Sequence, residues 1–336
     1  MASTPTTDVL SDLLGAGEQD NRQPPSALTR ALRFARRRKL GAIGIILMAL
    51  VLLVAIFSPL LQRYDDNLQF IAANESFEAS QSGASVLEQL QSGKTEEDVS
   101  ENVTERFLPP SSEHWLGTDA FGRDIYARII VGTRLAVLIG VFASLIAVVA
   151  GTVMGVISGY LGGIVDLSMQ RVIDGLQAFP ALVLLLLIVQ VFDQPPLWVT
   201  IAALGFLGWA INTRIIRSAV LAIRQQPYIE AARSFGATDL RVMLQHVLPN
   251  IVAPIIVVFS IGIGAYILAE ASLSFLGLGP ADKTTWGKMV QAGRVGLDLH
   301  PWEALFAGLA ITLTVLGFNL AGDALRDEFD PRLRGR

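Results

Sequence analysis

Residues 228–236 read Tyr-Ile-Glu-Ala-Ala-Arg-Ser-Phe-Gly and residues 247–250 read Val-Leu-Pro-Asn, and both segments lie between long apolar stretches. Alanine, glutamate and arginine favour helix, and Pro227 stands just before them, where the first turn of a helix tolerates proline. Gly236 closes the run and suits a left-handed residue after the last turn. The sequence therefore predicts a short helix in a polar loop, then a second helix capped by Thr238 and a turn at Pro249.

The rest of the chain is too apolar for a soluble protein. Of its 336 residues, 52% are hydrophobic and 17% are charged, whereas soluble domains carry about 25% charged residues. A membrane-spanning helix needs about 20 largely apolar residues. We therefore predict an all-α polytopic membrane protein with about six transmembrane helices. The predicted spans are 40–61, 130–160, 164–192, 197–222, 251–277 and 302–322.

Positive charge predicts the orientation, because cytoplasmic loops carry an excess of Lys and Arg. Basic residues cluster before the first helix, at the end of the fourth helix and in the loop that follows, and in the C-terminal tail, whereas residues 62–128 carry thirteen Asp or Glu against five Lys or Arg. We expect both termini and the polar loop in the cytoplasm. The loop between the fifth and sixth spans, with Lys283, Lys288 and Arg294, runs against this bias.

The predicted organisation has five parts, and the acidic segment is the least regular of them. Its insertion at 65–107 is rich in Ser and Gln and lacks a core-forming run, so a loose loop and a small helical cap are both open. The parts are a cytoplasmic tail at 1–39, the first transmembrane helix at 40–61, an extracytoplasmic segment at 62–129, a core of five helices at 130–322 with a cytoplasmic loop at 223–250, and a cytoplasmic tail at 323–336.

Several function classes are disfavoured by composition. A net charge of −4 without a large basic cluster argues against nucleic-acid binding. The chain has no cysteine and three dispersed histidines, so we expect no metal site and no thiol catalysis. It also lacks the G-x-x-x-x-G-K-[ST] phosphate loop, so we expect no ATP binding by that route. No converging set of catalytic groups is recognisable, and the chain is predicted not to be an enzyme.

The short predicted helix has a face suited to a partner. Tyr228, Ala231, Ala232 and Phe235 recur at i, i+3, i+4 and i+7 and share one side. Small alanines between two aromatic residues form a ridge that can enter a groove on another protein. A helix lying on the membrane surface, with its aromatic rings among the headgroups, is the alternative.

A longer pattern favours the protein partner. Glu230-Ala231-Ala232 is followed by three residues, Gly236, nine residues, and then His246-Val247-Leu248-Pro249. This pattern resembles the EAA loop of ABC importer permeases, with His246 in place of the usual isoleucine. Further segments resemble the C-type subunit of the dipeptide/oligopeptide/nickel branch, over residues 30–64 and 108–334. The insertion departs from that resemblance. The further segments are 114–119, 122–124, 270–279, 286–287, 301–302, 319–327 and 330–332.

The resemblance implies a type I ABC importer permease fold and a place in a larger assembly. The partners implied are a homologous second permease subunit, two cytoplasmic ABC ATPase subunits, an extracytoplasmic substrate-binding protein and the lipid bilayer. ATP and Mg would be bound by the ATPases, and this chain would bind no cofactor. The implied location is the cytoplasmic (inner) membrane of a bacterium or archaeon. The cargo expected first is short peptides; nickel chelates, glutathione and oligosaccharides are alternatives, and an ion-coupled secondary transporter is a different class.

Individual residues also have expected roles, some from their chemistry and position and, for the coupling residues, from the resemblance. Glu270 lies in an otherwise apolar span, and we expect a pore or gate residue or, equally, a subunit-interface contact. An ion-pair network is expected among Asp166, Arg171 and Asp174, and the tryptophans 115, 286 and 302 are expected at the membrane interface. The residues expected to couple to the ATPase are Tyr228, Glu230, Ala231, Ala232, Arg233, Phe235, Gly236, Leu248 and Pro249.

Overall fold

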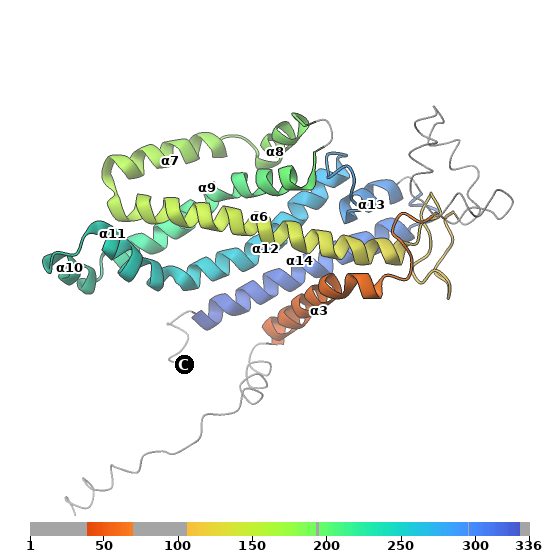
Figure 1. Ribbon diagram of the computed structural model, residues 1–336, viewed down its shortest axis with the longest axis horizontal. Coiled ribbons are helices and arrows are strands. Elements are labelled where there is room, and N and C mark those ends of the chain that lie inside the picture. The colour runs from red at the N-terminus through yellow and green to blue at the C-terminus, as the bar shows by residue number, and fades with distance from the viewer. Residues whose placement is uncertain (1–38, 70–105, 193–194, 295, 330–336) are drawn as a thin grey trace, which may run out of the picture. The chain divides into compact units, whose positions relative to one another are not determined.

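The computed structural model describes residues 39–69, 106–192, 195–294 and 296–329. Most of the predicted N-terminal tail at 1–39, most of the predicted insertion at 65–107 and the end of the C-terminal tail lie outside the described residues. Within them the secondary structure is helical apart from one isolated bridge between Thr118 and Asp124. The main helices are α3 (Lys39–Leu61), α6 (Ile125–Leu161), α7 (Gly163–Gln177), α8 (Ala181–Gln190), α9 (Leu197–Arg224), α10 (Pro227–Ser234), α11 (Asp239–Val242), α12 (Val252–Phe275), α13 (Trp286–Gly293) and α14 (Trp302–Phe329) (Figure 1).

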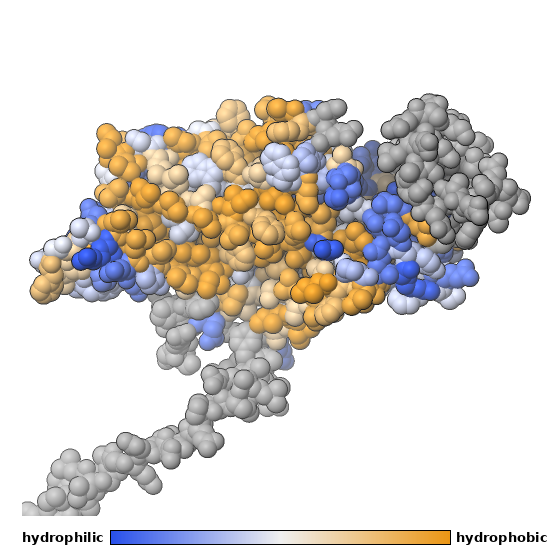
Figure 2. Space-filling model, viewed as in Figure 1, coloured by the Kyte–Doolittle hydropathy of each residue, from blue (hydrophilic) through white to orange (hydrophobic). Residues whose placement is uncertain are grey.

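Five of the described helical segments are long and apolar enough to cross a membrane, and six if a bent pair forms one span. This agrees with the predicted all-α membrane fold. Two helices run past their predicted bounds, because α6 already begins at Ile125 and α14 continues to Phe329. Figure 2 shows apolar side chains over much of the face that α6 and α7 present, with hydrophilic residues near α10 and at the opposite end. Such a surface suits a bilayer.

The third predicted span is not one straight helix. Residues 164–192 form α7 and α8, which are bent by 79° at a short break. Pro180 lies in the break and has extended ψ, consistent with the restraint that a proline places on helix continuation. The apolar composition of the segment does not reveal this bend, because hydropathy reports burial in the membrane and not direction.

The turn predicted at Pro249 is instead a helical connection. The segment Asp239–Phe275 runs as one candidate span through a π-helical turn at Met243–Val247 and a 3₁₀ turn at Leu248–Ile251. The wider π-helical turn and the tighter 3₁₀ turn let the helix continue past Pro249, which has no N–H to donate. The Asn250 side-chain amide donates to the His246 carbonyl at 2.6 Å, which satisfies an acceptor at this irregular point.

Helices α6 and α9 approach most closely along a glycine face of α6. A side chain at Gly151, Gly155 or Gly159 would meet α9 atoms within 2.5–2.9 Å. Small residues let helix backbones come together, and van der Waals packing then replaces contact with lipid. Helices α7, α8 and α12 lie alongside this close pair (Figure 1).

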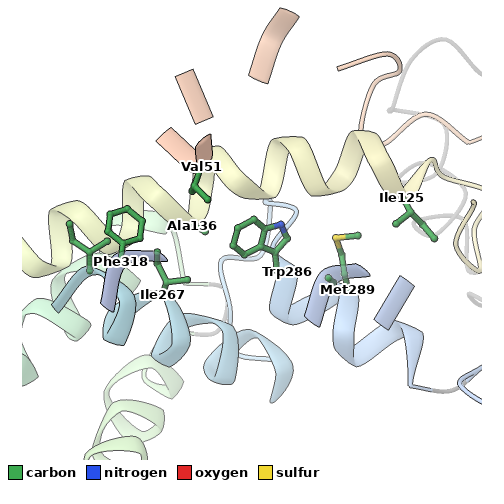
Figure 3. Packing of buried hydrophobic residues seen from close by; sticks show 9 residues of the cluster. Val51, Ile125, Ala136, Ile267, Trp286, Met289 and Phe318 are labelled. Atoms are coloured by element: carbon green, nitrogen blue, oxygen red, sulfur yellow. The ribbon is translucent and has the colours of Figure 1, made fainter. Parts of the chain in front are cut away.

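A second packing centre joins α3, α6, α12, α13 and α14. Figure 3 shows Trp286 among side chains from these helices. Trp286 is buried and donates its indole N–H to the Ile129 carbonyl at 3.2 Å, so its predicted place at the membrane interface is wrong. Gly132 leaves the space that the indole ring fills, since a side chain there would approach the ring within 2.7 Å.

Candidate functional site

Helix α10 is the short helix predicted from residues 228–236, and its end is defined by hydrogen bonds. Gly236 has φ +82° and donates its N–H to the Arg233 carbonyl at 2.9 Å, while the Ala237 N–H donates to the Ala232 carbonyl at 3.1 Å. These two bonds form a Schellman motif, whose left-handed position favours glycine. Thr238 then caps α11 by accepting from the Arg241 N–H at 3.4 Å.

One buried side chain attaches α10 to the bundle. Ile229 is 1% exposed and packs in a cluster with Val156 and Tyr160 of α6 and Ile216 and Val220 of α9. Its role is not visible in the sequence, because Ile229 stands between exposed residues and its burial depends on two distant helices. Its apolar character beside a polar run was the only available signal.

A polar contact reinforces the same attachment. The Tyr160 hydroxyl donates to the Asp239 carboxylate at 2.9 Å and accepts from Arg233 Nε at 3.1 Å. The Arg233 guanidinium also lies over the Tyr160 ring, 4.8 Å from its centroid. Arg233 therefore links α10 to the end of α6 and the start of α11, in addition to any contact with a partner.

The outer surface of α10 is left open. Tyr228 is 42% and Phe235 is 92% exposed, and Glu230 and Ala231 are exposed beside them. Ala232 is half-buried and packs on the Ile229 cluster, so it is the member of the predicted face that turns partly inward. A phenylalanine this exposed beside a tyrosine and an alanine forms an apolar projection that the described part of the chain does not cover.

The second part of the motif, residues 247–250, packs in the same apolar cluster as Ile229 of α10 through Val247 and Leu248. Leu248 is half-buried and packs against the Ile229 cluster, next to the fully buried Val247 and Ile251. Pro249 is exposed. The structure thus brings residues 228–236 and 247–251 together, and places Leu248 as a packing residue of this end of the bundle.

A cavity of about 780 Å³ lies where α7, α8, α9 and α12 meet. Its lining is mostly apolar, with polar atoms from Gln177, Asn212 and Tyr266. The Tyr266 hydroxyl lies at Gly208, where any larger residue would displace it. The break between α7 and α8 contributes Phe179 and Pro180 to the wall.

Glu270 lies away from this cavity. It is 2% exposed, accepts a hydrogen bond from the Ser274 hydroxyl at 2.5 Å and points toward the α13 region. Lys288 of α13 donates to the carbonyls of Ala281 and Lys283, each at 3.1 Å, and burial lowers the pKa of its ammonium. In the described chain Glu270 therefore makes contacts inside the subunit.

The ion pairs predicted for α7 are present, with partners that the sequence did not indicate. The Asp166 carboxylate accepts from Arg217 Nε at 2.6 Å and Nη2 at 2.5 Å, and from the Ser158 hydroxyl at 2.5 Å. Asp174 pairs with Arg214 of α9 and, at 3.4 Å, with Arg171 of its own helix. The two arginines of α9 lie one turn apart, which matches them to one face of α7.

The other end of the bundle holds a buried ionic cluster. The Asp119 carboxylate accepts from the N–H groups of Phe121 and Arg123 and pairs with Arg123 Nε at 2.7 Å and Arg128 Nη1 at 3.5 Å. Glu303 of α14 is buried near Arg128. The sequence signal was the run 114–124, which carried a resemblance but no predicted role.

The same run contains a second pair. Asp124 caps α6 through its Oδ1, which accepts from the Ala127 N–H at 2.8 Å, and its Oδ2 lies 2.9 Å from His114 Nδ1. Both side chains are buried. These contacts give the loop a defined shape at the start of α6. Across the part of the chain that the structure describes, no three His, Asp or Glu side chains are grouped so as to hold a metal ion.

Comparisons with known proteins cover nearly the whole chain. A family model described as "Binding-protein-dependent transport system inner membrane component" matches residues 151–335, and one described as "N-terminal TM domain of oligopeptide transport permease C" matches residues 26–80. The dipeptide transport system permease protein DppC of Alkalihalophilus pseudofirmus is 37% identical over 317 residues, which are 94% of this chain and 93% of that relative.

The names of two further relatives mention different substrates. The oligopeptide transport system permease protein OppC of Bacillus subtilis is 34% identical over 304 residues, covering 90% of this chain and 88% of the relative. The glutathione transport system permease protein GsiD of Shigella flexneri is 47% identical over 227 residues, covering 67% of this chain and 75% of the relative. The chain is thus similar to permeases whose names mention dipeptide, oligopeptide or glutathione transport.

Proposed function

We infer the function from one premise: this chain belongs to the family of binding-protein-dependent transport system inner membrane components. The family consists of permease subunits of ABC importers, which are multi-pass membrane proteins and not enzymes. The chain is accordingly a permease subunit of an ABC importer, with the helical fold described above. An ion-coupled secondary transporter, considered from the sequence, finds no support in this membership.

The cargo that we propose is short peptides. The support is the similarity to dipeptide and oligopeptide permeases along about nine-tenths of this chain. The similarity to glutathione permeases, 47% over 227 residues, favours glutathione as a second candidate. Both cargos carry a peptide bond and free charged ends, so the receptor is the part that would separate them. Uptake of labelled dipeptide and labelled glutathione by reconstituted transporter, each with its receptor, decides between the two.

The partners proposed are a homologous second permease, two cytoplasmic ATPases that bind ATP and Mg, and an extracytoplasmic substrate-binding protein. The pore would then lie between the two permeases, in the cytoplasmic membrane of a bacterium or archaeon. Both termini of this chain and the end of the bundle with α10 would lie in the cytoplasm, as the distribution of basic residues indicates.

The observation that carries the coupling proposal is the exposed ridge of α10 on a buried attachment. Tyr228, Glu230, Ala231 and Phe235 are open to a partner, while Ile229 secures the helix to α6 and α9. Arg233 and Leu248 would act by holding α10 in place, Gly236 by its left-handed backbone, and Ala232 and Pro249 by the shape of the surface. A helix that is held firmly against α6 and α9 can pass a displacement on to them when the partner groove that encloses it moves.

Glu270 was expected as a pore or gate residue or as a subunit-interface contact, and we propose that it acts on the pore through the position of its helix and not by contact with cargo. Because it is buried against Ser274 and the α13 region, we propose that it sets the position of α12 next to the outer segments. Glu270→Gln keeps the shape of the side chain and an oxygen that can accept from Ser274, so we expect uptake close to that of wild type; a large loss of uptake would show that the ionisable carboxyl group itself is needed.

Purification of the chain with its membrane partners tests the proposed function. We expect the ATPase subunits to co-purify with the intact chain and to be lost when Tyr228 and Phe235 are both changed to alanine. Consistent absence of any ATPase from the wild-type assembly would overturn the proposal.

A further inference from the structure

Helix α7 depends on charge for its attachment to α9. Ile173 is the single buried residue of α7 among those described, whereas α8 buries both Leu185 and Val189 in an apolar cluster shared with α9. The polar side-chain contacts between α7 and α9 are the bonds of Asp166 to Arg217 and of Asp174 and Gln177 to Arg214, and Asp166 and Gln170 also bond to Ser158 of α6. Apolar packing of α7 is therefore sparse, and ionic bonds form a large share of its side-chain contacts with α9.

We propose that the two α7–α9 ion pairs, Asp166–Arg217 and Asp174–Arg214, make α7 follow α9, so that a movement of α10 changes the cavity at the α7–α8 break. The inference rests on the proposed function, since it concerns how a displacement caused by the ATPases reaches the membrane part of this subunit. The four charged residues are positioning residues, with no direct contact with cargo required.

The first step runs from α10 to α9. Two residues separate Arg224 from Pro227, and Gln226 donates its N–H to the Ile223 carbonyl at 3.0 Å and accepts from the Ile229 N–H at 3.0 Å. Ile229 also packs on Ile216 and Val220 of α9. A short hydrogen-bonded connection with a buried side chain leaves little freedom, so α10 and the end of α9 move as a unit.

The second step runs from α9 to α7. Arg217 grips the Asp166 carboxylate with two nitrogens, a bidentate geometry that fixes orientation as well as distance. Ser158 of α6 donates to the same carboxylate. Arg214 contacts Asp174 eight residues further along α7, so the two helices are joined at two separated points and cannot pivot about one.

The third step runs from α7 to the cavity. Arg214 donates to the Gln177 side chain at 2.5 Å as well as to Asp174. Gln177, Phe179 and Pro180 line the cavity, together with Ile211, Asn212 and Ile215 that flank Arg214 on α9. The 79° break next to these residues is where a displacement of α7 can be absorbed without moving the packed α8.

The absence of cysteine from the chain permits a direct test. Phe179 is exposed in the cavity wall, so a Phe179→Cys variant carries one thiol on this subunit. In the complete reconstituted transporter, with second permease, ATPases and receptor, the labelling rate of that thiol by a maleimide is measured without nucleotide and with vanadate-trapped ATP. Uptake and ATP hydrolysis are recorded in the same preparations.

Three changes, with Arg217→Asp alone as a reference for the second, are compared in this Phe179→Cys background. The first neutralises both pairs, with Arg214→Gln and Arg217→Gln together. The second exchanges one pair, Asp166→Arg with Arg217→Asp. The control is Arg171→Gln, which removes one arginine charge from a 75% exposed side chain that bonds to Asp174 within α7 and not to α9.

We expect the nucleotide-dependent difference in labelling to be lost in the neutralised variant, together with uptake per ATP hydrolysed. It should persist in the control and return in the exchanged pair relative to Arg217→Asp alone. An unchanged difference in the neutralised variant would overturn the inference and leave the proposed function standing. If the neutralised variant fails to assemble, an exchanged pair that assembles but shows no difference overturns it equally. Absence of ATP-dependent uptake in the Phe179→Cys background and in wild type alike would instead overturn the proposed function.

Discussion

Truncation of Ile229 in α10 and of Phe235 directly after α10 should affect stability and ATPase binding in opposite ways. Ile229 is 1% exposed inside the subunit and Phe235 is 92% exposed, although both lie on or next to the same short helix. Ile229→Ala removes a packed side chain from the cluster with Val156, Ile216 and Val220, which costs about 2–5 kcal/mol of folding free energy. Phe235→Ala removes nothing from the interior, and changes at such exposed sites stay within about 0.5 kcal/mol.

The order reverses for association with the ATPase. Burying a phenylalanine side chain in a groove contributes about 1.5–3 kcal/mol. Since each 1.4 kcal/mol corresponds to a factor of ten in affinity, Phe235→Ala should weaken ATPase binding about ten- to a hundredfold. Ile229→Ala should reduce binding only in proportion to the fraction of the subunit that loses its native structure at the assay temperature.

Two measurements on the full-length chain separate these effects. Thermal unfolding in detergent, followed by tryptophan fluorescence, should show a clear fall in the transition temperature for Ile229→Ala and none for Phe235→Ala. Titration with the purified ATPase should show the loss of affinity for Phe235→Ala. A Phe235→Ala variant that binds the ATPase as wild type does would refute the assignment of this ridge to the ATPase groove.

Three further changes have definite expected outcomes. Gly236→Val should lower ATP-coupled uptake while the subunit remains in the membrane, because a β-branched residue at φ +82° costs at least about 1–2 kcal/mol; Gly236→Asn is the tolerated control, and normal coupled uptake by the valine variant would contradict the reasoning. Gly155→Val should prevent close packing of α6 on α9, where the new side chain would meet Ile216 and Thr213 at 2.9 Å, so the yield of folded subunit should fall; Gly175→Ala, with open space around it, should leave the yield unchanged or raise it. Asp119→Ala removes the carboxylate that pairs with the buried Arg128 and should lower the free energy of unfolding by about 3–5 kcal/mol, measured by detergent thermal unfolding, whereas Asp282→Ala, which removes an exposed ion pair with Lys283, should have little effect.

The local signals of the sequence were sufficient for α10 and its ends. Pro227 before the run, Gly236 after it and Thr238 before the next helix each act through the backbone of the four or five nearest residues. No distant partner is needed for these effects, so they can be predicted from the chain alone. The same holds for the membrane spans, because the length of an apolar run must match the thickness of a bilayer.

Features that depend on two distant segments could not be predicted in this way. Trp286 was expected at the membrane interface, yet Gly132 of α6 opens a space for it in the interior. An ion-pair network was expected among Asp166, Arg171 and Asp174, but the α9 arginines that pair with the two aspartates follow only from the way α7 folds back after α6. The bend at Pro180 changes the direction of a span without changing its hydropathy.

For α10 and its surface, the sequence and the tertiary structure likewise determined different features. The sequence alone determined that this is a helical membrane protein with a short, capped helix in a polar loop, since apolar length and backbone preference act locally. Only the tertiary structure decided which side of that helix is free. Ile229 and Ala232 turn inward because α6 and α9 present an apolar cluster to them, and Tyr228, Ala231 and Phe235 are thereby left outward. Burial is a property of the packed helices together, and it is this burial that turns a recognisable motif into a rigid surface.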